Sequence, residues 1–230
     1  MEKVFNNSHV KKNVRAISSK SEAHRALICA ALADRETMLI CTDTNADIDA
    51  TAGCLNSLGA RIRRTADGFH IIPVSDVKNN SVLDCNESGS TLRFLLPLAS
   101  SLGASCSFLM RGRLAQRPLS PLYELLAENG VTLSPQGKNP LIISGRLPCG
   151  DYSVAANISS QYISGLLFAL SVREGESRLK LCGRVESAPY IEMTVSTLRT
   201  FGANIEFDRE NSLFIIKGKD KLSSPGEFTV

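Results

Sequence analysis

The chain has 230 residues, of which 43% are hydrophobic and 21% are charged, and its formal net charge is +3. This length can bury the core of one large domain or two small ones. The balanced charge, without a dense basic run, argues against nucleic-acid binding. No apolar stretch approaches the roughly 18 residues of a membrane helix, and the start of the chain lacks the apolar core of a signal peptide. We therefore expect a cytoplasmic monomer with neither a nucleic-acid nor a membrane partner.

Seven cysteines are scattered along the chain, and no two of them have CxxC spacing. Their positions are Cys29, Cys41, Cys54, Cys85, Cys106, Cys149 and Cys182. This pattern indicates neither a zinc site nor a redox pair. We expect reduced thiols that are mostly buried.

The first predicted helix begins at the polar run Ser19–Ser21 and leads into an apolar stretch. A strand is expected next, near residues 38–41. A second helix follows, because Ile48, Ala52 and Leu55 recur at +4 and +7 and therefore share one helical face.

The second helix is predicted to stop at Gly59, because glycine adopts the left-handed conformation past the last turn at little cost. Alternating side chains in residues 60–63 then indicate a strand. A return strand is expected around Ile71, and Asp67 with Gly68 supplies the turn between the two strands.

The same series of elements recurs twice more. The helix-ending glycines Gly59, Gly130 and Gly202 are 71 and 72 residues apart. Two further polar helix starts lie at residues 88–90 and 159–161. The spacing of the apolar face seen in the second helix recurs from Leu119 before Gly130 and from Ile191 before Gly202, at Leu119, Tyr123 and Leu126 and at Ile191, Val195 and Leu198. The return strands are expected around Ile143 and Ile215. A unit of strand, helix, strand, helix, strand and strand is therefore expected three times. We place the three units at about 15–75, 82–146 and 152–220, all in one domain that covers residues 1–230.

The first helix of each predicted unit is apolar enough to be buried on most sides. We expect these helices to pack inward, with the sheets and the second helices outside them. The predicted fold class is an α/β (α+β) domain of three βαβαββ repeats with pseudo-threefold symmetry.

Polar helix starts have a chemical consequence, because a helix N-terminus carries unpaired N–H groups and about half a positive charge. Lys20, Arg25, Arg93 and Arg117 stand around the three starts. If the starts face one region, they suit a small ligand that carries phosphate and carboxylate groups. Taken singly, the serines remain explicable as helix caps, Arg25 and Arg93 as surface charges, and Arg117 as the beginning of a helix.

The three histidines, His9, His24 and His70, form no spaced pair and stand near no nucleophile motif, so they are assigned no role. The chain has no P-loop and no GxGxxG motif, so nucleotide binding is unsupported.

Five segments, in order, resemble motifs of the 3-phosphoshikimate 1-carboxyvinyltransferase (EPSP synthase) family. Residues 19–27 resemble its S-K-S-x-x-x-R-A-L signature, and residues 87–93 its N-x-G-T-x-x-R segment. Residues 113–119 are similar to its R-x-x-x-R-P motif, residues 159–162 to S-S-Q-[FY], and residues 187–191 to S-x-P-Y-I. The resemblance covers nearly the whole chain and implies an inside-out α/β domain of three βαβαββ units.

The resemblance also implies a reaction, which is transfer of the enolpyruvyl group of phosphoenolpyruvate to the 5-hydroxyl of shikimate 3-phosphate. This reaction of the shikimate pathway for aromatic amino acids needs no metal and no organic cofactor. Lys20 and Arg117 would take part in catalysis. Glyphosate competes at the phosphoenolpyruvate site in this family.

Binding roles follow from the resemblance position by position. Shikimate 3-phosphate would be bound by Lys20, Ser21, Arg25, Ser159, Ser160, Gln161, Ser187 and Tyr190. Ser21 and Arg25 would lie chiefly at its carboxylate side, and Ser159, Ser160 and Ser187 would hold its phosphate. Phosphoenolpyruvate would be bound by Lys20, Gly89, Arg117 and Gln161.

The chain departs from the family pattern at several points. Ile17 and Ser18 stand where most members have Pro-Gly, Glu87 replaces the usual Asn, and Ser90 replaces Thr. Members are about twice as long, so we expect an N-terminal half that lacks the C-terminal domain with the main acid/base carboxylates. Such a half is expected to bind shikimate 3-phosphate and to be inactive alone. A UDP-N-acetylglucosamine enolpyruvyltransferase and a non-catalytic binding module of the same fold remain the alternatives.

Overall fold

The computed structural model describes residues 16–230, which form six α-helices, one short 3-10 helix and twelve strands. The helices are α1 (Lys20–Ala31), α2 (Ala46–Leu58), α3 (Gly89–Leu102), η1 (Leu114–Gln116), α4 (Leu122–Glu128), α5 (Ser160–Ser171) and α6 (Ala188–Thr200). The strands are β1 (Thr37–Ile40), β2 (Arg61–Arg64), β3 (Gly68–Ile72), β4 (Ser81–Asp84), β5 (Cys106–Leu109), β6 (Val131–Leu133), β7 (Leu141–Gly145), β8 (Asp151–Ala155), β9 (Gly175–Cys182), β10 (Asn204–Asp208), β11 (Leu213–Gly218) and β12 (Glu227–Thr229).

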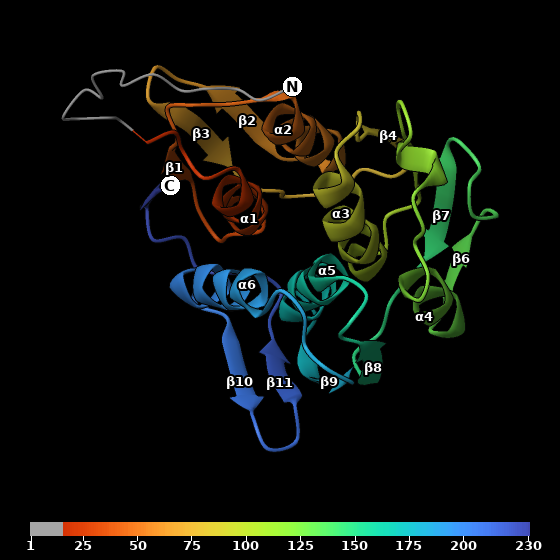
Figure 1. The fold of residues 1–230 in the computed structure, drawn as a ribbon. Helices are drawn as coiled ribbons and strands as arrows, with labels where there is room; N and C mark the ends of the chain where they lie inside the picture. Colours follow the sequence, from red (N-terminus) through yellow and green to blue (C-terminus); the bar gives the residue numbers. More distant parts are fainter. Residues whose placement is uncertain (1–15) are drawn as a thin grey trace, which may run out of the picture.

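Helices α1, α3 and α5 form the centre of the molecule, and three sheets lie around them (Figure 1). Residues 23–31 of α1 and 162–171 of α5 are buried without interruption, and most of α3 is buried as well. These helices have no solvent-facing stripe, as their apolar composition predicts. The inside-out α/β class is therefore confirmed.

The second helices are amphipathic and cover the central three from outside. In α2 and α6 the apolar positions predicted from the sequence are buried, while the opposite faces are polar. Helix α4 is shorter than predicted, because it begins at Leu122 and not at Leu119. Pro121 at its N-cap restricts the residue before it to non-helical conformations. Arg117 therefore follows the 3-10 turn η1 and does not begin a helix, which corrects that interpretation.

The three sheets share one topology. Their strand orders are β12-β1-β3-β2, β4-β5-β7-β6 and β8-β9-β11-β10. In each sheet the first pair is parallel and the following pairs are antiparallel. The return strands carry Ile71, Ile143 and Ile215, as predicted.

The first sheet is completed from the far end of the described chain. Strand β12 pairs with β1 in parallel, with Met38 opposite Glu227. It takes the position that β4 and β8 hold in the other two sheets. The preceding residues are tied to the start of β1 and to the turn before it, since the Thr37 and Ser224 hydroxyls are 2.7 Å apart and the Ser224 amide donates to Asp34.

Helices α3 and α5 make a close contact at Gly165. A methyl group placed there would lie 2.4 Å from the carbonyl oxygen of Arg93 and 2.8 Å from Cγ of Pro97. The two helices therefore depend on the absence of a side chain at this position. The ring of Phe94 on α3 meets Phe168 on α5 edge-on, with centroids 5.6 Å apart.

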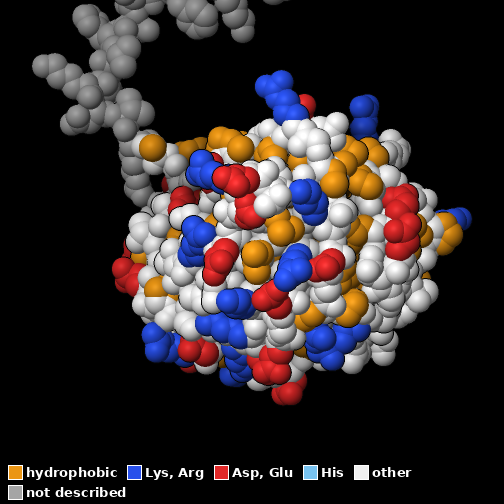
Figure 2. Space-filling model, turned by 90° about the horizontal axis from the view of Figure 1, so that it is seen from below, with side chains coloured by type: hydrophobic (Ala, Val, Ile, Leu, Met, Phe, Trp, Pro, Cys, Tyr) orange, Lys and Arg blue, Asp and Glu red, His pale blue; other side chains and the backbone are white. Residues whose placement is uncertain are grey.

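The exposed face of the molecule in Figure 2 carries Lys and Arg side chains interspersed with Asp and Glu. No helix within residues 16–230 is long and apolar enough to cross a bilayer. All seven cysteines are free and five of them are buried, as expected.

We predict that Gly165→Ala lowers the free energy of unfolding by about 2–3 kcal/mol, because the added methyl group must push α3 and α5 apart. Chemical denaturation monitored by circular dichroism measures this change. Gly53→Ala is the matched control, since nothing lies within 4 Å of a methyl group at this position of α2. Its higher helix propensity should leave stability equal or raise it by up to about 1 kcal/mol. Equal effects of the two changes would contradict the close contact.

Candidate functional site

The three predicted polar helix starts are true N-caps. The hydroxyls of Ser19, Ser88 and Ser159 accept hydrogen bonds from the amides of Glu22, Thr91 and Gln161 at 3.3, 3.2 and 3.2 Å. Each therefore satisfies one unpaired amide of its helix. The remaining first-turn amides keep the positive end of each helix available to an anion.

Two arginines meet at the start of α3. A methyl group placed on Gly89 would lie 2.6 Å from Nη1 of Arg93 and 3.2 Å from Nη1 of Arg117. Nη2 of Arg93 donates to the carbonyl of Pro118, the residue after Arg117. Glycine is therefore the residue that leaves room for both guanidinium groups beside the helix N-terminus.

Gln161 joins this group from α5. Its Oε1 accepts from Nη1 of Arg93 at 3.0 Å, and its Nε2 donates to the Ser90 hydroxyl at 3.0 Å. The side chains of α3, α5 and the segment after η1 thus converge. We call Gly89, Ser90, Arg93, Arg117 and Gln161 the anion cluster, because its two guanidinium groups and the start of α3 suit a negatively charged ligand.

Lys20 stands at the start of α1 and is half exposed. Its Nζ lies 2.9 Å from Oδ2 of Asp47, in the first turn of α2. One of the three ammonium donors is used in this way. Asp47 was not singled out in the sequence, where nothing marked it as the partner of Lys20.

Arg25 is 3% exposed and joins α1 to α5 and α6. Its guanidinium donates to the hydroxyls of Thr194 and Ser164 and to the carbonyls of Ser21 and Tyr190, at 2.5–3.5 Å. Burial lowers the pKa of Arg25 to about 10, so it remains charged near neutral pH. The structure thus places Ser21, Arg25 and the backbone of Tyr190 together.

The starts of α5 and α6 are adjacent in space. The amide of Glu186, just before α6, donates to the carbonyl of Ala156, just before α5. Ser159 and Ser160 are partly exposed, and Ser187 is exposed. Ser187 has a φ of 57°, a left-handed conformation that non-glycine residues adopt at a cost. The Tyr190 side chain is 47% exposed one turn later.

His24, which was assigned no role from the sequence analysis, lies in a buried hydrogen-bond chain. Its Nδ1 is 2.7 Å from the Thr51 hydroxyl, which is 2.7 Å from the Thr91 hydroxyl, which donates to the Ser88 hydroxyl at 2.7 Å. These four side chains are at most 1% exposed. Burial lowers the pKa of His24 to about 4, and the nearby Lys20 and Arg25 act in the same direction while Asp47 opposes them.

Equivalent positions of units one and three form hydrogen bonds between the two helices of each unit. In every unit these positions are the fifth residue after the capping serine and the eighth residue before the glycine stop. These pairs are His24 with Thr51, Arg93 with Leu122, and Ser164 with Thr194. The first and third pairs are hydrogen-bonded at 2.7 Å. In the second pair leucine offers no oxygen, and Arg93 reaches across to Gln161 of the third unit.

The contacts form a circuit around the helix starts. Lys20 bonds to α2, Thr51 of α2 to α3, Arg93 of α3 to α5, and Arg25 of α1 to α5 and α6. The predicted residues on α1, α3 and α5 are therefore linked through neighbouring side chains and do not lie on unconnected surfaces.

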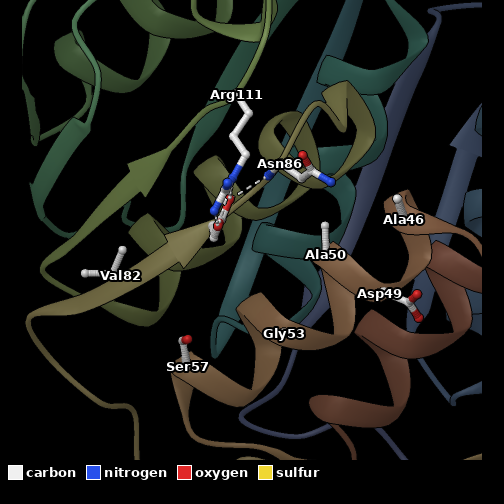
Figure 3. Close-up of a pocket in the computed structure, with 9 residues that line it drawn as sticks. Ala46, Asp49, Ala50, Gly53, Ser57, Val82, Asn86 and Arg111 are labelled. Carbon is white, nitrogen blue, oxygen red and sulfur yellow. Dashed lines mark hydrogen bonds and ion pairs between the residues drawn. The ribbon is translucent and has the colours of Figure 1, made fainter.

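Two surface hollows are lined by residues outside this circuit. One, of about 550 Å³, is lined by small residues of α2, including Ala50 and Gly53, and by Asn86 and Arg111 (Figure 3). Arg111 pairs there with Asp84 at 2.6 Å, which lowers the pKa of that carboxyl group. The other, of about 800 Å³, lies between α6 and the third sheet. Neither is lined by a predicted site residue.

Within residues 16–230 no group of three or more His, Cys, Asp or Glu is placed to hold a metal.

A family model described as EPSP synthase (3-phosphoshikimate 1-carboxyvinyltransferase) matches residues 4–230. The chain belongs to the EPSP synthase family. It is 39% identical over 222 residues to a 3-phosphoshikimate 1-carboxyvinyltransferase of Clostridium botulinum, covering 94% of this chain and 51% of that protein. It is 41% identical over 214 residues to that of Clostridium perfringens, covering 92% and 50%. The chain thus spans about half the length of the curated relatives it matches.

Solved structures agree on the fold. EPSP synthase of Acinetobacter baumannii is similar with a TM-score of 0.78 at 22% identity, covering 93% of this chain and 48% of that one. The enolpyruvyl transferase NikO of Streptomyces tendae gives a TM-score of 0.67 at 20% identity, with coverage of 96% and 52%. The inside-out fold predicted from the family resemblance is therefore the fold of this family.

We predict that His24 makes the protein sensitive to mild acid. The folded state keeps its imidazole neutral down to about pH 4, whereas the unfolded chain protonates it below 6.5. The unfolded state therefore binds more protons between these values, and stability falls as pH falls. The loss should reach about 3 kcal/mol near pH 4, at about 1.4 kcal/mol for each pH unit. Urea unfolding of the wild type and His24→Asn from pH 7 to pH 4 measures it. Parallel stability curves for the two proteins would contradict the prediction.

Proposed function

We propose that the chain is the shikimate 3-phosphate-binding half of an enzyme that transfers the enolpyruvyl group of phosphoenolpyruvate to the 5-hydroxyl of that substrate. The observation that carries the proposal is the anion cluster, where Gly89, Arg117 and Gln161, expected at the phosphoenolpyruvate site, converge at the ends of α3 and α5. Membership of the EPSP synthase family supports the reaction class.

Phosphoenolpyruvate carries a phosphate and a carboxylate, and both suit planar guanidinium groups beside a helix N-terminus. Arg117 and the start of α3 bind one of these anionic groups. Gln161 fixes Arg93, so that the cluster keeps its shape when the ligand leaves. Lys20, half exposed at the start of α1 and paired with Asp47, supplies a point charge toward both substrates.

Shikimate 3-phosphate lies across the starts of α1, α5 and α6 in this proposal. Ser159, Ser160 and Ser187 hold its phosphate, and Tyr190 covers it. Ser21 and Arg25 lie at its carboxylate side. Arg25 already makes four hydrogen bonds to protein groups, so it acts mainly by its charge and by holding α6 against α1.

The reaction forms a bond between the 5-oxygen of shikimate 3-phosphate and C2 of phosphoenolpyruvate, while C3 gains a proton and the hydroxyl loses one. The tetrahedral intermediate then loses phosphate, and C3 returns a proton as the double bond re-forms. The residues of this half position both substrates and offset the negative charge of the phosphate that leaves. A second half, equivalent to the part of the curated relatives that this chain does not span, supplies the acid/base groups and closes over the site.

Reconstitution tests the proposal. A separately made C-terminal half from a Clostridium relative is added to the chain, and release of phosphate from phosphoenolpyruvate is followed with shikimate 3-phosphate present. Turnover by the mixture, with none by either half alone, is expected. Turnover with UDP-N-acetylglucosamine in place of shikimate 3-phosphate would favour the nucleotide-sugar alternative. Binding of shikimate 3-phosphate without turnover by any mixture would favour a non-catalytic module.

We predict that Arg117→Ala lowers kcat/KM of the reconstituted enzyme by about 100-fold or more, because one donor to the developing charge is lost. Steady-state phosphate release measures this. Lys138→Ala removes an exposed cation from the hairpin between β6 and β7 and is the matched control. A similar loss in both variants would point to general electrostatics and not to the anion cluster.

We predict that Gly89→Ala raises the KM for phosphoenolpyruvate by about tenfold or more, a change of about 1.4 kcal/mol. Its methyl group would displace the guanidinium groups of Arg93 and Arg117. The KM for shikimate 3-phosphate should change less than threefold. The helical Gly53→Ala variant serves as the control for backbone effects. An unchanged KM for phosphoenolpyruvate would place that substrate away from Gly89.

A further inference from the structure

A chain of four buried side chains runs from the middle of α1 to the N-cap of α3, and neither the reaction nor the predicted contacts use it. It links His24, Thr51, Thr91 and Ser88 by three contacts of 2.7 Å each. Ser88 caps α3, whose first residue is Gly89 of the anion cluster. This hydrogen-bond chain therefore ends at Ser88, the residue next to Gly89 of the anion cluster.

The direction of these hydrogen bonds follows from counting hydrogens. A threonine hydroxyl has one hydrogen to donate. That of Thr91 goes to the Ser88 hydroxyl, or to the carbonyl of Asp47 at 3.4 Å, which can only accept. Thr51 must therefore donate to Thr91, and its own hydrogen is used up. The remaining contact requires that Nδ1–H of His24 donates to Thr51.

The same count of hydrogens describes both ends of the hydrogen-bond chain. His24 is the neutral tautomer with hydrogen on Nδ1, and its Nε2 is a buried acceptor without a partner among the described residues. Ser88 accepts twice, from the amide and the hydroxyl of Thr91. Bonds that all point one way polarise one another and strengthen the chain.

Stability alone does not explain this arrangement. A buried nitrogen without a partner costs free energy, and apolar groups of similar shape serve as well in a core. The second unit illustrates this, because Leu122 holds the position equivalent to Thr51. The low pKa of His24, set by burial, keeps the imidazole neutral as the count requires.

We propose that His24 is a positioning residue of the anion cluster: its Nδ1–H heads a one-way hydrogen-bond chain through Thr51 and Thr91 that fixes Ser88 and the first turn of α3 for an anionic ligand. The proposal rests on the proposed function for the identity of that ligand, phosphoenolpyruvate. The tautomer and the rigidity of the first turn of α3 do not depend on it.

The first test reads the tautomer directly in the 230-residue chain. Nitrogen-15 NMR of the labelled imidazole, at pH 6 to 8, should show hydrogen on Nδ1 and none on Nε2. Hydrogen on Nε2, or rapid exchange between the two tautomers, would overturn the proposal whatever the protein binds.

The second test uses three variants matched in size. His24→Asn keeps a donor near the position of Nδ1, His24→Gln carries its amide near the position of Nε2, and His24→Leu carries none. Amide hydrogen exchange at Thr91 should be about 3- to 10-fold faster in the Gln and Leu variants, the worth of one hydrogen bond. The Asn variant should stay within about twofold of the wild type.

The third test measures the KM for phosphoenolpyruvate in the reconstituted enzyme. It should rise about 3- to 10-fold in His24→Leu and His24→Gln, while the KM for shikimate 3-phosphate stays within twofold and Asn restores the wild-type value. Thr51→Val should behave like His24→Leu, and the double variant should be no worse than either alone. An Asn variant as impaired as Leu would overturn the positioning role. If the wild type shows no turnover, the proposed function fails. The tautomer and exchange results still decide whether the hydrogen bonds from His24 to Ser88 point in the proposed direction.

Discussion

Burial of α1, α3 and α5 on all sides is the constraint on which the rest of the structure depends. A helix without a solvent-facing stripe can present polar groups only at its ends or through pairs formed inside the core. The three capping serines satisfy the ends, and the threonines of α2 and α6 satisfy the polar side chains that enter the core. The N-termini of these helices are therefore the places where polar groups can meet a ligand, and Lys20, Gly89 and Ser160 all lie there.

The threefold repeat matters most where it is broken. Units one and three use the pairs His24–Thr51 and Ser164–Thr194 to hold their two helices together. Unit two has Arg93 and Leu122 at these positions, so its arginine has no hydroxyl partner there and bonds instead to the carbonyl of Pro118. It crosses to Gln161 and stands beside Gly89, which concentrates positive charge at one of three otherwise similar helix starts. Divergence at this pair of positions, together with Arg117 and Gly89, thus distinguishes the anion cluster from its two counterparts.

The repeat and the inside-out arrangement were predictable, because helix phase, glycine stops and alternating strands are local signals. The start of α4 was missed, because the proline at 121 overrides an apolar pattern that continues through Leu119. The buried hydrogen-bond chain from His24 to Ser88 was also missed. Thr51 and Thr91 are 40 residues apart, and a lone histidine in an apolar helix has no spacing that marks it. The roles of Lys20, Arg25, Ser159, Ser160, Ser187 and Tyr190 came from the family motifs and remain predictions, although the helix starts that carry them are linked.

Strand β12 lies far along the sequence from the other strands of its sheet, so the order of synthesis determines when that sheet can be completed. Residues 37–72 contribute three strands of the first sheet, and the fourth is made only when residues 227–229 have left the ribosome. Until then the parallel edge of β1 has no partner and is open to pairing with other chains. A nascent chain can complete its second and third sheets before its first, because each of those is contiguous in sequence. Strand β12, made after the second and third sheets, therefore completes the sheet whose other strands were made first.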